Sequence, residues 1–473
     1  MSLTSALSAA ATGLGAVARA TEVVASNIAN ADTEGYGRRE LQLSSSHHLS
    51  GVRIDGVARL VNTGLLSEAR IASAGSGHAQ TLSTWSRTAE AVIGIPGDGT
   101  SLPDRVAALE SALILASAQP ESDLHLSGVL DATKTLAEGI NRAGTAAQDA
   151  RQGAENAIAR DIDQLNAGLS EVARLNRAIV AEGASGRDTS SLQDARQRVI
   201  DSIGEIIPMR EVTRDHGTVS LFTTSGAALL DRREPVTITF TPVTAITPDM
   251  TATTGGAPGF LNVDGLDLSA DQMRLYSGGR LEANFTIRDK LAPALQAQAD
   301  QLAADLAARF DAIPGTTGLF GDAAGTHATP GLAQRLEVSA LADPARGGDL
   351  WRLRAGLGAA TPGAPSDATL LIAMRTALET PRTGASLIAG SSPRSAGGLA
   401  IELSALTSTA RLQTDSILTN RNAHSQSLQQ ALAAGGVDTD AELQRLLALE
   451  QAYAANARVI RAADSMLNTL LEI

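Results

Sequence analysis

The sequence predicts a mainly α-helical, elongated protein with a small β insertion, in which the N- and C-terminal helices pair as a coiled-coil stem. Three observations predict this class. Apolar side chains recur at alternating spacings of three and four residues at both ends of the chain. A helical pattern without proline runs through residues 127–182, and a period of two residues is confined to the middle of the sequence.

The N-terminal stripe advances in steps that alternate four and three residues. Its members are Leu3, Leu7, Ala10, Leu14, Val17, Thr21, Val24 and Ile28, of which Thr21 is the polar one. This spacing is that of a coiled-coil seam, in which every member faces the same partner. The stripe covers about 25 residues, or roughly 38 Å of helix.

The C-terminal stripe has the same length and the same alternation. Its members are Leu446, Leu449, Tyr453, Asn456, Ile460, Ala463, Leu467 and Leu470. A single polar residue at such a position commonly sets register and partner number, which makes Asn456 a candidate for that role. Two stripes of matched length predict that the ends pair with each other. The alternative is that each helix packs separately on a globular body, as amphipathic helices usually do.

Three further helices are expected inside the ends. The first covers residues 127–182, a length that is unusual in a compact domain and indicates a rod, and it should stop at the glycines of 183–186. The second covers residues 288–313, with Pro293 near its start, where proline is tolerated. The third covers residues 398–434 and should end before Gly435; its apolar stripe, which includes Ile417, fades toward that end.

The middle of the chain changes to a period of two. Val219, Leu221 and Thr223 alternate after a turn signal at 215–217, and a second alternation follows at 236–240. Residues 314–393 are rich in Gly, Pro, Ala and Thr, with one strand-like piece at 336–338 and one helix-like piece at 368–379. The expected division is a terminal helical stem (1–60 and 398–473), a helical rod (61–206 and 285–397, including the irregular 314–393) and a small β domain (207–284).

Composition excludes several functional classes. The chain has no cysteine, which excludes disulfides, thiolate metal sites and cysteine nucleophiles. Its net charge of −13 argues against a nucleic-acid coat. The longest apolar runs, such as residues 112–116, are far shorter than the ~20 residues that span a bilayer. The first basic residue is Arg19, so no secretory signal with a charged start is expected.

The sequence offers no convincing active site. Its seven histidines are scattered, and none has the spacing of a metal pair. The glycines of residues 13–18 match a loose dinucleotide fingerprint, but no strand precedes them and they lie within the N-terminal stripe. Asp161 and Asp163 point to different helix faces and are expected to be solvated. We therefore expect no catalytic residue, no cofactor and no metal. The alternatives are an enzyme with an unrecognised site and a cytosolic helical adapter.

The run SNIANADTEGY at residues 26–36 resembles the N-terminal signature of the bacterial flagellar rod, hook and hook-associated proteins. Ser26 and Asp32 stand where that signature usually has asparagine, which is a conservative change in hydrogen bonding. Gly35 fits a chain reversal after the first helix, and asparagine and aspartate favour such turns.

The C-terminal runs EQAYAANARVI (450–460) and ADSMLNTLL (463–471) resemble the end of the flagellar hook-associated protein 1 family. The middle runs LQDAR (192–196) and SGGRL (277–281) also fit that family. Residues 242–266 and 315–395 match poorly, and the chain is short for the family. One outer β domain of the family is therefore expected to be reduced or absent.

The resemblance implies a structural subunit of the flagellum that joins hook and filament and lets the filament assemble on the hook tip. It implies copies of the chain in a ring or helical lattice, with the hook protein below and the next hook-associated protein above. It also implies export through the flagellar type III apparatus without a cleaved leader, an extracellular location, and a cytoplasmic export chaperone at the C-terminal helix. Neither nucleic acid nor membrane is implied as a partner.

The assembly interface is expected at both ends of the chain. Its candidate residues are Leu3, Leu7, Leu14, Val17, Val24, Asn27, Ile28, Asn30, Gly35, Tyr36, Leu446, Leu449, Tyr453, Asn456, Ile460, Leu467 and Leu470. Two alternatives within the same class are the hook subunit and hook-associated protein 3. The long helix at 127–182 argues against the hook subunit, and the run at 451–460 argues against hook-associated protein 3.

Overall fold

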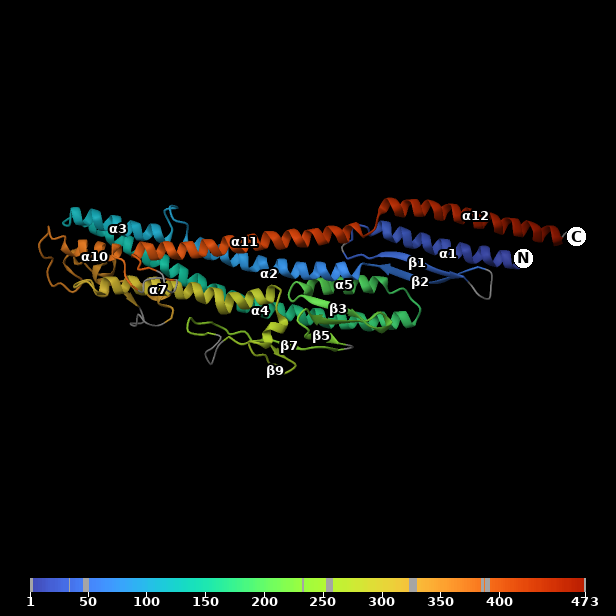
Figure 1. The fold of residues 1–473 in the computed structure, drawn as a ribbon, viewed down its shortest axis with the longest axis horizontal. Helices are drawn as coiled ribbons and strands as arrows, with labels where there is room; N and C mark the ends of the chain where they lie inside the picture. Colours follow the sequence, from blue (N-terminus) through green and yellow to red (C-terminus); the bar gives the residue numbers. More distant parts are fainter. Residues whose placement is uncertain are drawn as a thin grey trace.

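The structure, a computed structural model, shows a long molecule with both chain ends at the same tip (Figure 1). It describes residues 3–33, 35–45, 51–231, 234–251, 258–322, 330–383, 387 and 392–471. The chain runs out from the tip through long helices and returns beside them. The predicted class, mainly α with a β insertion and paired terminal helices, is confirmed.

The tip consists of two antiparallel helices and a hairpin. Helix α1 (Leu3–Ala29) lies beside α12 (Thr439–Leu471). The prediction of a wholly helical stem over 1–60 is wrong beyond α1, because β1 (Arg38–Ser45) and β2 (Val52–Leu60) form an antiparallel hairpin. Alternation of polar and apolar residues along both strands favours this pairing.

Five long helices form the body of the molecule. They are α2 (Thr63–Ile93), α3 (Leu102–Ala118), α4 (Asp123–Ala184), α7 (Ala292–Asp311) and α11 (Ala396–Ala434). The helix predicted at 127–182 is α4, which starts after the capping hydroxyl of Ser122 and ends before Gly186, a left-handed position with φ +72°. Small side chains such as Ala143 and Ala147 are fully buried on α4, so neighbouring helices approach closely without aromatic side chains.

The helix predicted at 288–313 starts earlier than expected. Helix α6 (Arg280–Thr286) leads through a π-helical turn, η3 (Ile287–Leu291), directly into α7. Pro293 lies in the first turn of α7 and has no N–H for the carbonyl four residues back. The widened π turn accommodates that missing bond, so the proline is tolerated inside a continuous helix.

Helices α2 and α11 pack along each other, and several contacts between them are polar. Asp415 of α11 accepts hydrogen bonds from Ser83 Oγ (2.7 Å) and Arg87 Nε (3.0 Å) of α2. Arg411 of α11 forms an ion pair of 2.6 Å with Glu90 of α2. The predicted stripe fades toward the C-terminal end of this helix, where Ile417 is 44% exposed and the buried side chains are Leu418 and Ser425.

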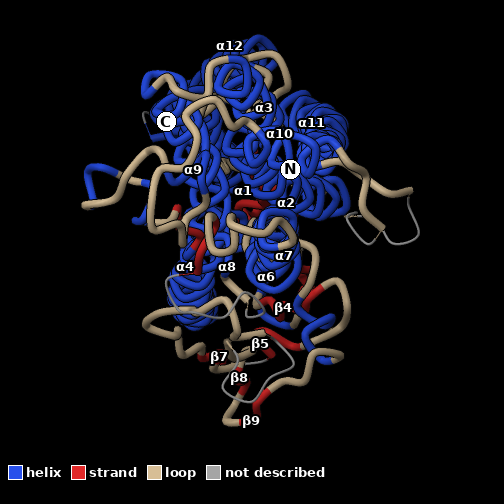
Figure 2. Tube along the Cα trace, turned by 90° about the vertical axis from the view of Figure 1, so that its left-hand side faces the viewer, coloured by secondary structure: helices blue, strands red, loops and turns tan. Residues whose placement is uncertain are grey.

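The β insertion forms a lobe on one side of the helices (Figure 2). It contains β3 (Met209–Thr213), β4 (Val219–Thr223), β5 (Ala228–Asp231) and β6 (Glu234–Pro235) in one sheet, and β7 (Ile238–Thr239), β8 (Asn262–Val263) and β9 (Leu266–Asp267) in another. The short helix η1 (Asp215–Gly217) connects β3 to β4, and η2 (Gln272–Tyr276) follows β9 on the way to the next helix. Leu221 and Leu230 pack on the second half of α4, beside α5 (Ser190–Gly204). The alternation predicted at 219–223 is therefore confirmed.

The Gly- and Pro-rich stretch packs at the far end of the body. Its elements are β10 (Phe320–Asp322), α8 (Leu332–Arg335), β11 (Leu336–Val338), η4 (Ala340–Ala342), η5 (Pro344–Arg346), α9 (Arg352–Ala355) and α10 (Thr369–Glu379). The predicted strand at 336–338 and helix at 368–379 are both present. Residues 323–329, 384–386 and 388–391 lie outside the described residues. In the part of the chain that is described, no helix is long and apolar enough to cross a membrane.

Two glycines of α4 provide a test of this packing. A Cβ added at Gly168 would lie 2.3 Å from Cγ2 of the buried Ile203 on α5, whereas a Cβ at Gly153 would meet nothing within 4 Å. We expect Gly168→Ala to lower the free energy of unfolding by about 1–2 kcal/mol, because overpacking outweighs the gain in helix propensity. Gly153→Ala should raise it by about 0.5–1 kcal/mol. Urea unfolding of both variants measures the difference; equal stabilities would contradict the packing of α5 on α4.

Candidate assembly interface at the stem

The two terminal helices contact each other along their predicted stripes. On α1, Val24 is buried and Leu7, Leu14, Val17 and Ile28 are half-buried. On α12, Leu446, Leu449, Asn456 and Ile460 are half-buried and Ala463 is buried. The side chains of Leu3 and Leu470 lie outside the described residues. The structure thus brings most of the predicted seam together, in antiparallel order.

Asn456 of α12 packs against Gly13 of α1. A Cβ at Gly13 would lie 3.1 Å from Asn456 Nδ2 and 3.2 Å from its Oδ1. The polar residue of the α12 stripe therefore sits against a glycine of α1, where there is room for the amide. This matching of a glycine with an asparagine favours one register of the pair.

Large apolar side chains of α12 are exposed on several faces of the helix, among exposed polar and charged residues. Its large exposed side chains are 39–59% exposed and comprise Leu443, Leu447, Tyr453, Val459, Met466 and Leu467. Tyr453 and Leu467 belong to the predicted stripe, and the other four do not. The spacing of a single seam does not identify these four residues, because apolar side chains occupy more than one face of this helix.

The side chain of Asn27 connects three segments of the chain at the base of the stem. Its side chain is fully buried, and its Oδ1 accepts hydrogen bonds from Arg39 N and Tyr36 Oη, both at 2.9 Å. Its Nδ2 donates to the Arg39 carbonyl (2.9 Å) and to Glu442 Oε2 (3.2 Å). One amide therefore joins α1, the start of β1 and α12, and all its polar atoms are used within the subunit.

The neighbouring signature residues shape the turn that follows α1. Asn30 Nδ2 donates to the Ser26 carbonyl at 2.8 Å, which satisfies a group at the end of the helix. Gly35 has φ +75°, a left-handed conformation that favours glycine. The Arg39 guanidinium lies 4.8 Å from the centre of the Tyr36 ring. These predicted interface residues thus hold the hairpin against α1.

Glu442 is the carboxylate that ties α12 to the hairpin. It is 1% exposed, and its Oε1 accepts a hydrogen bond of 2.8 Å from Arg38 Nε. Its other oxygen accepts from Asn27. Sequence reasoning missed this role, although an acidic residue at a seam position, four residues before Leu446, was a visible signal.

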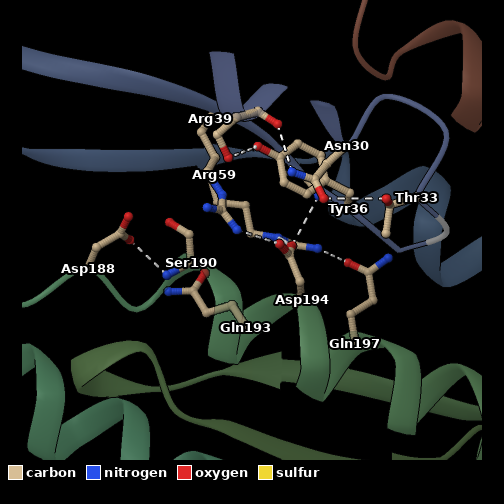
Figure 3. Close-up of polar contacts among 12 residues, drawn as sticks. Asn30, Thr33, Tyr36, Arg39, Arg59, Asp188, Ser190, Gln193, Asp194 and Gln197 are labelled. Atoms are coloured by element: carbon tan, nitrogen blue, oxygen red, sulfur yellow. Dashed lines mark hydrogen bonds and ion pairs between the residues drawn. The ribbon is translucent and has the colours of Figure 1, made fainter. Parts of the chain in front are cut away.

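Asp194 of α5 holds the hairpin to the body of the molecule (Figure 3). Arg39 and Arg59 lie directly opposite each other in the hairpin, a pairing of like charges that is unfavourable without an acid. Asp194 accepts from Arg59 Nε at 2.6 Å, from Arg39 Nη2 at 3.0 Å and from the N–H of Gly37 at 3.0 Å. Arg59 also donates to Gln197. The aspartate is 5% exposed.

Asp161 also differs from expectation. It is buried and accepts from Arg280 Nε (2.7 Å) and Asn284 Nδ2 (3.2 Å), so the prediction of a solvated side chain is wrong for it. Asp163 is exposed, and the two do lie on different faces of α4. Within the described residues, no group of three His, Asp or Glu side chains is placed to hold a metal ion.

Asp194→Asn tests the attachment of the hairpin. It leaves Arg39 and Arg59 opposite each other with no carboxylate between them, and we expect a loss of about 3–5 kcal/mol in the free energy of unfolding. Hydrogen exchange at residues 38–45 and 52–60 should speed up first. The control is Glu171→Gln, which removes an exposed pair with Arg174 and should change stability little. Equal effects of the two substitutions would contradict this role.

Comparisons with known proteins agree with this geometry. Residues 90–325 match the model of the flagellar hook-associated protein FlgK helical domain. Residues 7–36 match the flagella basal body rod protein model, and residues 428–473 match the flagellar basal body rod FlgEFG protein C-terminal model. The two terminal matches cover most of α1 and all of α12, the two helices that the structure brings together.

Among solved structures, the flagellar hook junction protein FlgK from Burkholderia pseudomallei is similar at 18% identity and a TM-score of 0.41. That match covers 54% of this chain and 44% of the other, so this chain spans less than half of that protein's length. No curated protein sequence matches. On the family models that match its two ends and its middle, the chain belongs to the FlgK family of flagellar hook-associated proteins.

Proposed function

We propose that this chain is a structural subunit of the junction between flagellar hook and filament, and that the filament assembles on the hook tip through it. The observation that carries the proposal is the set of exposed apolar side chains along α12, on a stem that both chain ends build. Exposed apolar surface of this extent is typical of an interaction site. Membership of a flagellar hook-associated family supplies the context.

In each subunit, part of the surface of both stem helices stays uncovered and is available for contacts with neighbouring subunits. Within the described residues of α12, Glu442 and Ala463 are the buried ones, so the subunit alone covers little of this helix. A buried Leu, Ile or Val side chain contributes about 1.5–3 kcal/mol, and neighbouring subunits can add several such contacts. Contacts between different surfaces of identical subunits generate a ring or a helical lattice.

The predicted interface residues divide into two roles in this proposal. Asn27, Asn30, Gly35 and Tyr36 face inward and hold the turn after α1, so they shape the stem without meeting a neighbour. Tyr453 and Leu467, with the four further exposed residues of α12, are proposed to contact adjacent subunits. The hook protein would lie below the ring and the next hook-associated protein above it.

We place the boundary of the stem at Gly435 and Gly436. Helix α11 packs along α2, and its start is buried in the core of the body. We therefore propose residues 1–60 and 437–473 as the stem, with α11 in the rod instead of in the stem region predicted from residue 398. Residues 207–284 remain the proposed β domain.

We also propose that the stem orders fully only on assembly, outside the cell, after export through the flagellar apparatus. An isolated helix of this length is marginal in water, and α12 gains little burial from α1 alone. Before export, a cytoplasmic chaperone would cover the apolar surface of α12. This role suits a structural protein and needs no catalytic group.

The decisive experiment removes the exposed surface without touching the fold. Leu443→Gln with Leu447→Gln should leave thermal unfolding of the monomer unchanged, because both side chains are largely exposed. Attachment of filaments to hooks, counted by electron microscopy, should fall at least tenfold. Leu115→Gln on α3, where leucine is 56% exposed, is the matched control. Deletion of residues 446–473 should abolish attachment; normal filaments on it would refute the proposal.

A second experiment measures the order of the free stem. In the monomer, amide hydrogens of α12 should exchange much faster than those of α4, whose apolar face is fully buried. Protection of α12 should rise on binding to purified hooks. Equal and strong protection of α4 and α12 in the monomer would show that the ends are already ordered before assembly.

A further inference from the structure

A cavity of about 300 Å³ lies where the hairpin, α2, α5 and β3 meet. Three arginines line it: Arg59 from β2, Arg70 from α2 and Arg196 from α5. Each of the three is at most 13% exposed. Among the described residues that line the cavity, Glu211 is the one carboxylate. The lining therefore carries an excess of positive charge.

Together with Arg39, the arginines at the cavity number four, and among the described residues three carboxylates pair with them, which leaves one positive charge in excess. Arg59 shares Asp194 with Arg39, as described above. Arg70 pairs with Asp201 and, at 2.7 Å, with Glu211, while its buried Nη2 has no hydrogen-bond partner. A buried guanidinium nitrogen without an acceptor is costly. Because Nη2 is shielded from a water-sized probe, an anion in the cavity would reach it through a small shift of the Arg70 side chain.

Arg196 has no acidic partner within the described part of the chain. Its Nη1 donates to Asn176 Oδ1 (2.9 Å) and to the Gly217 carbonyl (2.7 Å), both of them neutral acceptors. Burial lowers the pKa of Arg196, and the positive charges of Arg59 and Arg70 lower it further, against the opposing effect of Glu211. A negative charge in the cavity would offset both the burial of the Arg196 guanidinium and its repulsion by Arg59 and Arg70.

The start of α2 adds to the positive character of the cavity. Thr63 and Gly64, the first residues of this 31-residue helix, also line the cavity. The N-terminus of a helix carries a partial positive charge that favours anions. A volume of about 300 Å³ far exceeds the ~10–15 Å³ that a single water needs on the same measure, which leaves room for a small anion with part of its hydration.

We propose that this cavity binds a small oxyanion of the phosphate, sulfate or carboxylate class between Arg70 and Arg196. Guanidinium groups bind such oxygens through paired N–H donors. The anion contacts the rod through α2, the hairpin through Arg59 and the β lobe through β3, so it stiffens the joint between stem and rod. The site lies inside one subunit, so this inference does not depend on the proposed function.

The test uses the full-length monomer with inorganic phosphate and sulfate as probes. Calorimetric titration should show saturable binding of one anion per chain, and thermal unfolding should shift up by a few degrees relative to sodium chloride of equal ionic strength. A response equal to that of chloride, with no saturable binding, would overturn the proposal.

Two substitutions at Ser67 locate the site. Ser67 lines the cavity three residues before Arg70 on the same helix, so Ser67→Glu would place a carboxylate beside the arginines. We expect Ser67→Glu to unfold at a higher temperature than Ser67→Gln in phosphate-free buffer and to bind phosphate at least tenfold more weakly. Ser67→Gln, with the same size and no charge, should bind within a factor of about three of the wild type. Equal phosphate binding by the two variants would place the anion elsewhere and overturn the proposal.

Discussion

Two helices that pack only on each other cannot bury the whole of their apolar surfaces. In the stem, this constraint leaves apolar side chains of α12 exposed to solvent. A contact between two cylinders covers one stripe of each. On α12 the stripe that meets α1 is half-buried at best, apart from Glu442 and Ala463, and apolar side chains occupy other faces as well. Such a helix is incompletely covered in one subunit, and the proposed contacts with neighbouring subunits would cover it further.

The polar contacts at the base of the stem fix the position of the two terminal helices relative to each other and to the hairpin. An apolar seam can slide, whereas a buried amide with four hydrogen bonds has one position. Asn27, Glu442 and Asp194 lie on three segments that are far apart in sequence, and each is almost fully buried. They fix where the two chain ends leave the body, so that weak apolar contacts further along the stem need only supply affinity.

Sequence periodicity was informative where burial is local and repetitive. The stripes of α1 and α12 and the apolar face of α4 follow from spacing alone, because one face of each helix meets one partner. The hairpin at 38–60 was not predicted, because the stem was expected to be helical through residue 60. Asp194 and Asp161 were missed for another reason: their burial depends on arginines more than 100 residues away. Spacing along one helix carries no information about such partners.

The same physics explains how a chain with 2% aromatic residues orders its irregular segments. Arg309 of α7 is buried and donates to the carbonyls of Ala377, Thr380 and Arg394. Arg151 of α4 donates in the same way to carbonyls that include that of Thr247. Loop carbonyls that leave water need donors, and one guanidinium supplies five in a fixed plane.

Lysine could not replace these arginines, because its ammonium is a compact point charge without the planar fork that spans several carbonyls at once. The arginines of the long helices thereby hold loop carbonyls at several points. The Gly- and Pro-rich stretch also contributes apolar side chains of its own to the core of the body, among them Phe320, Leu353 and Leu371. Its own arginines act in the same way, since Arg354 donates to the carbonyls of Pro362 and Pro365. The order of this stretch is therefore encoded both in the rod and in the stretch itself.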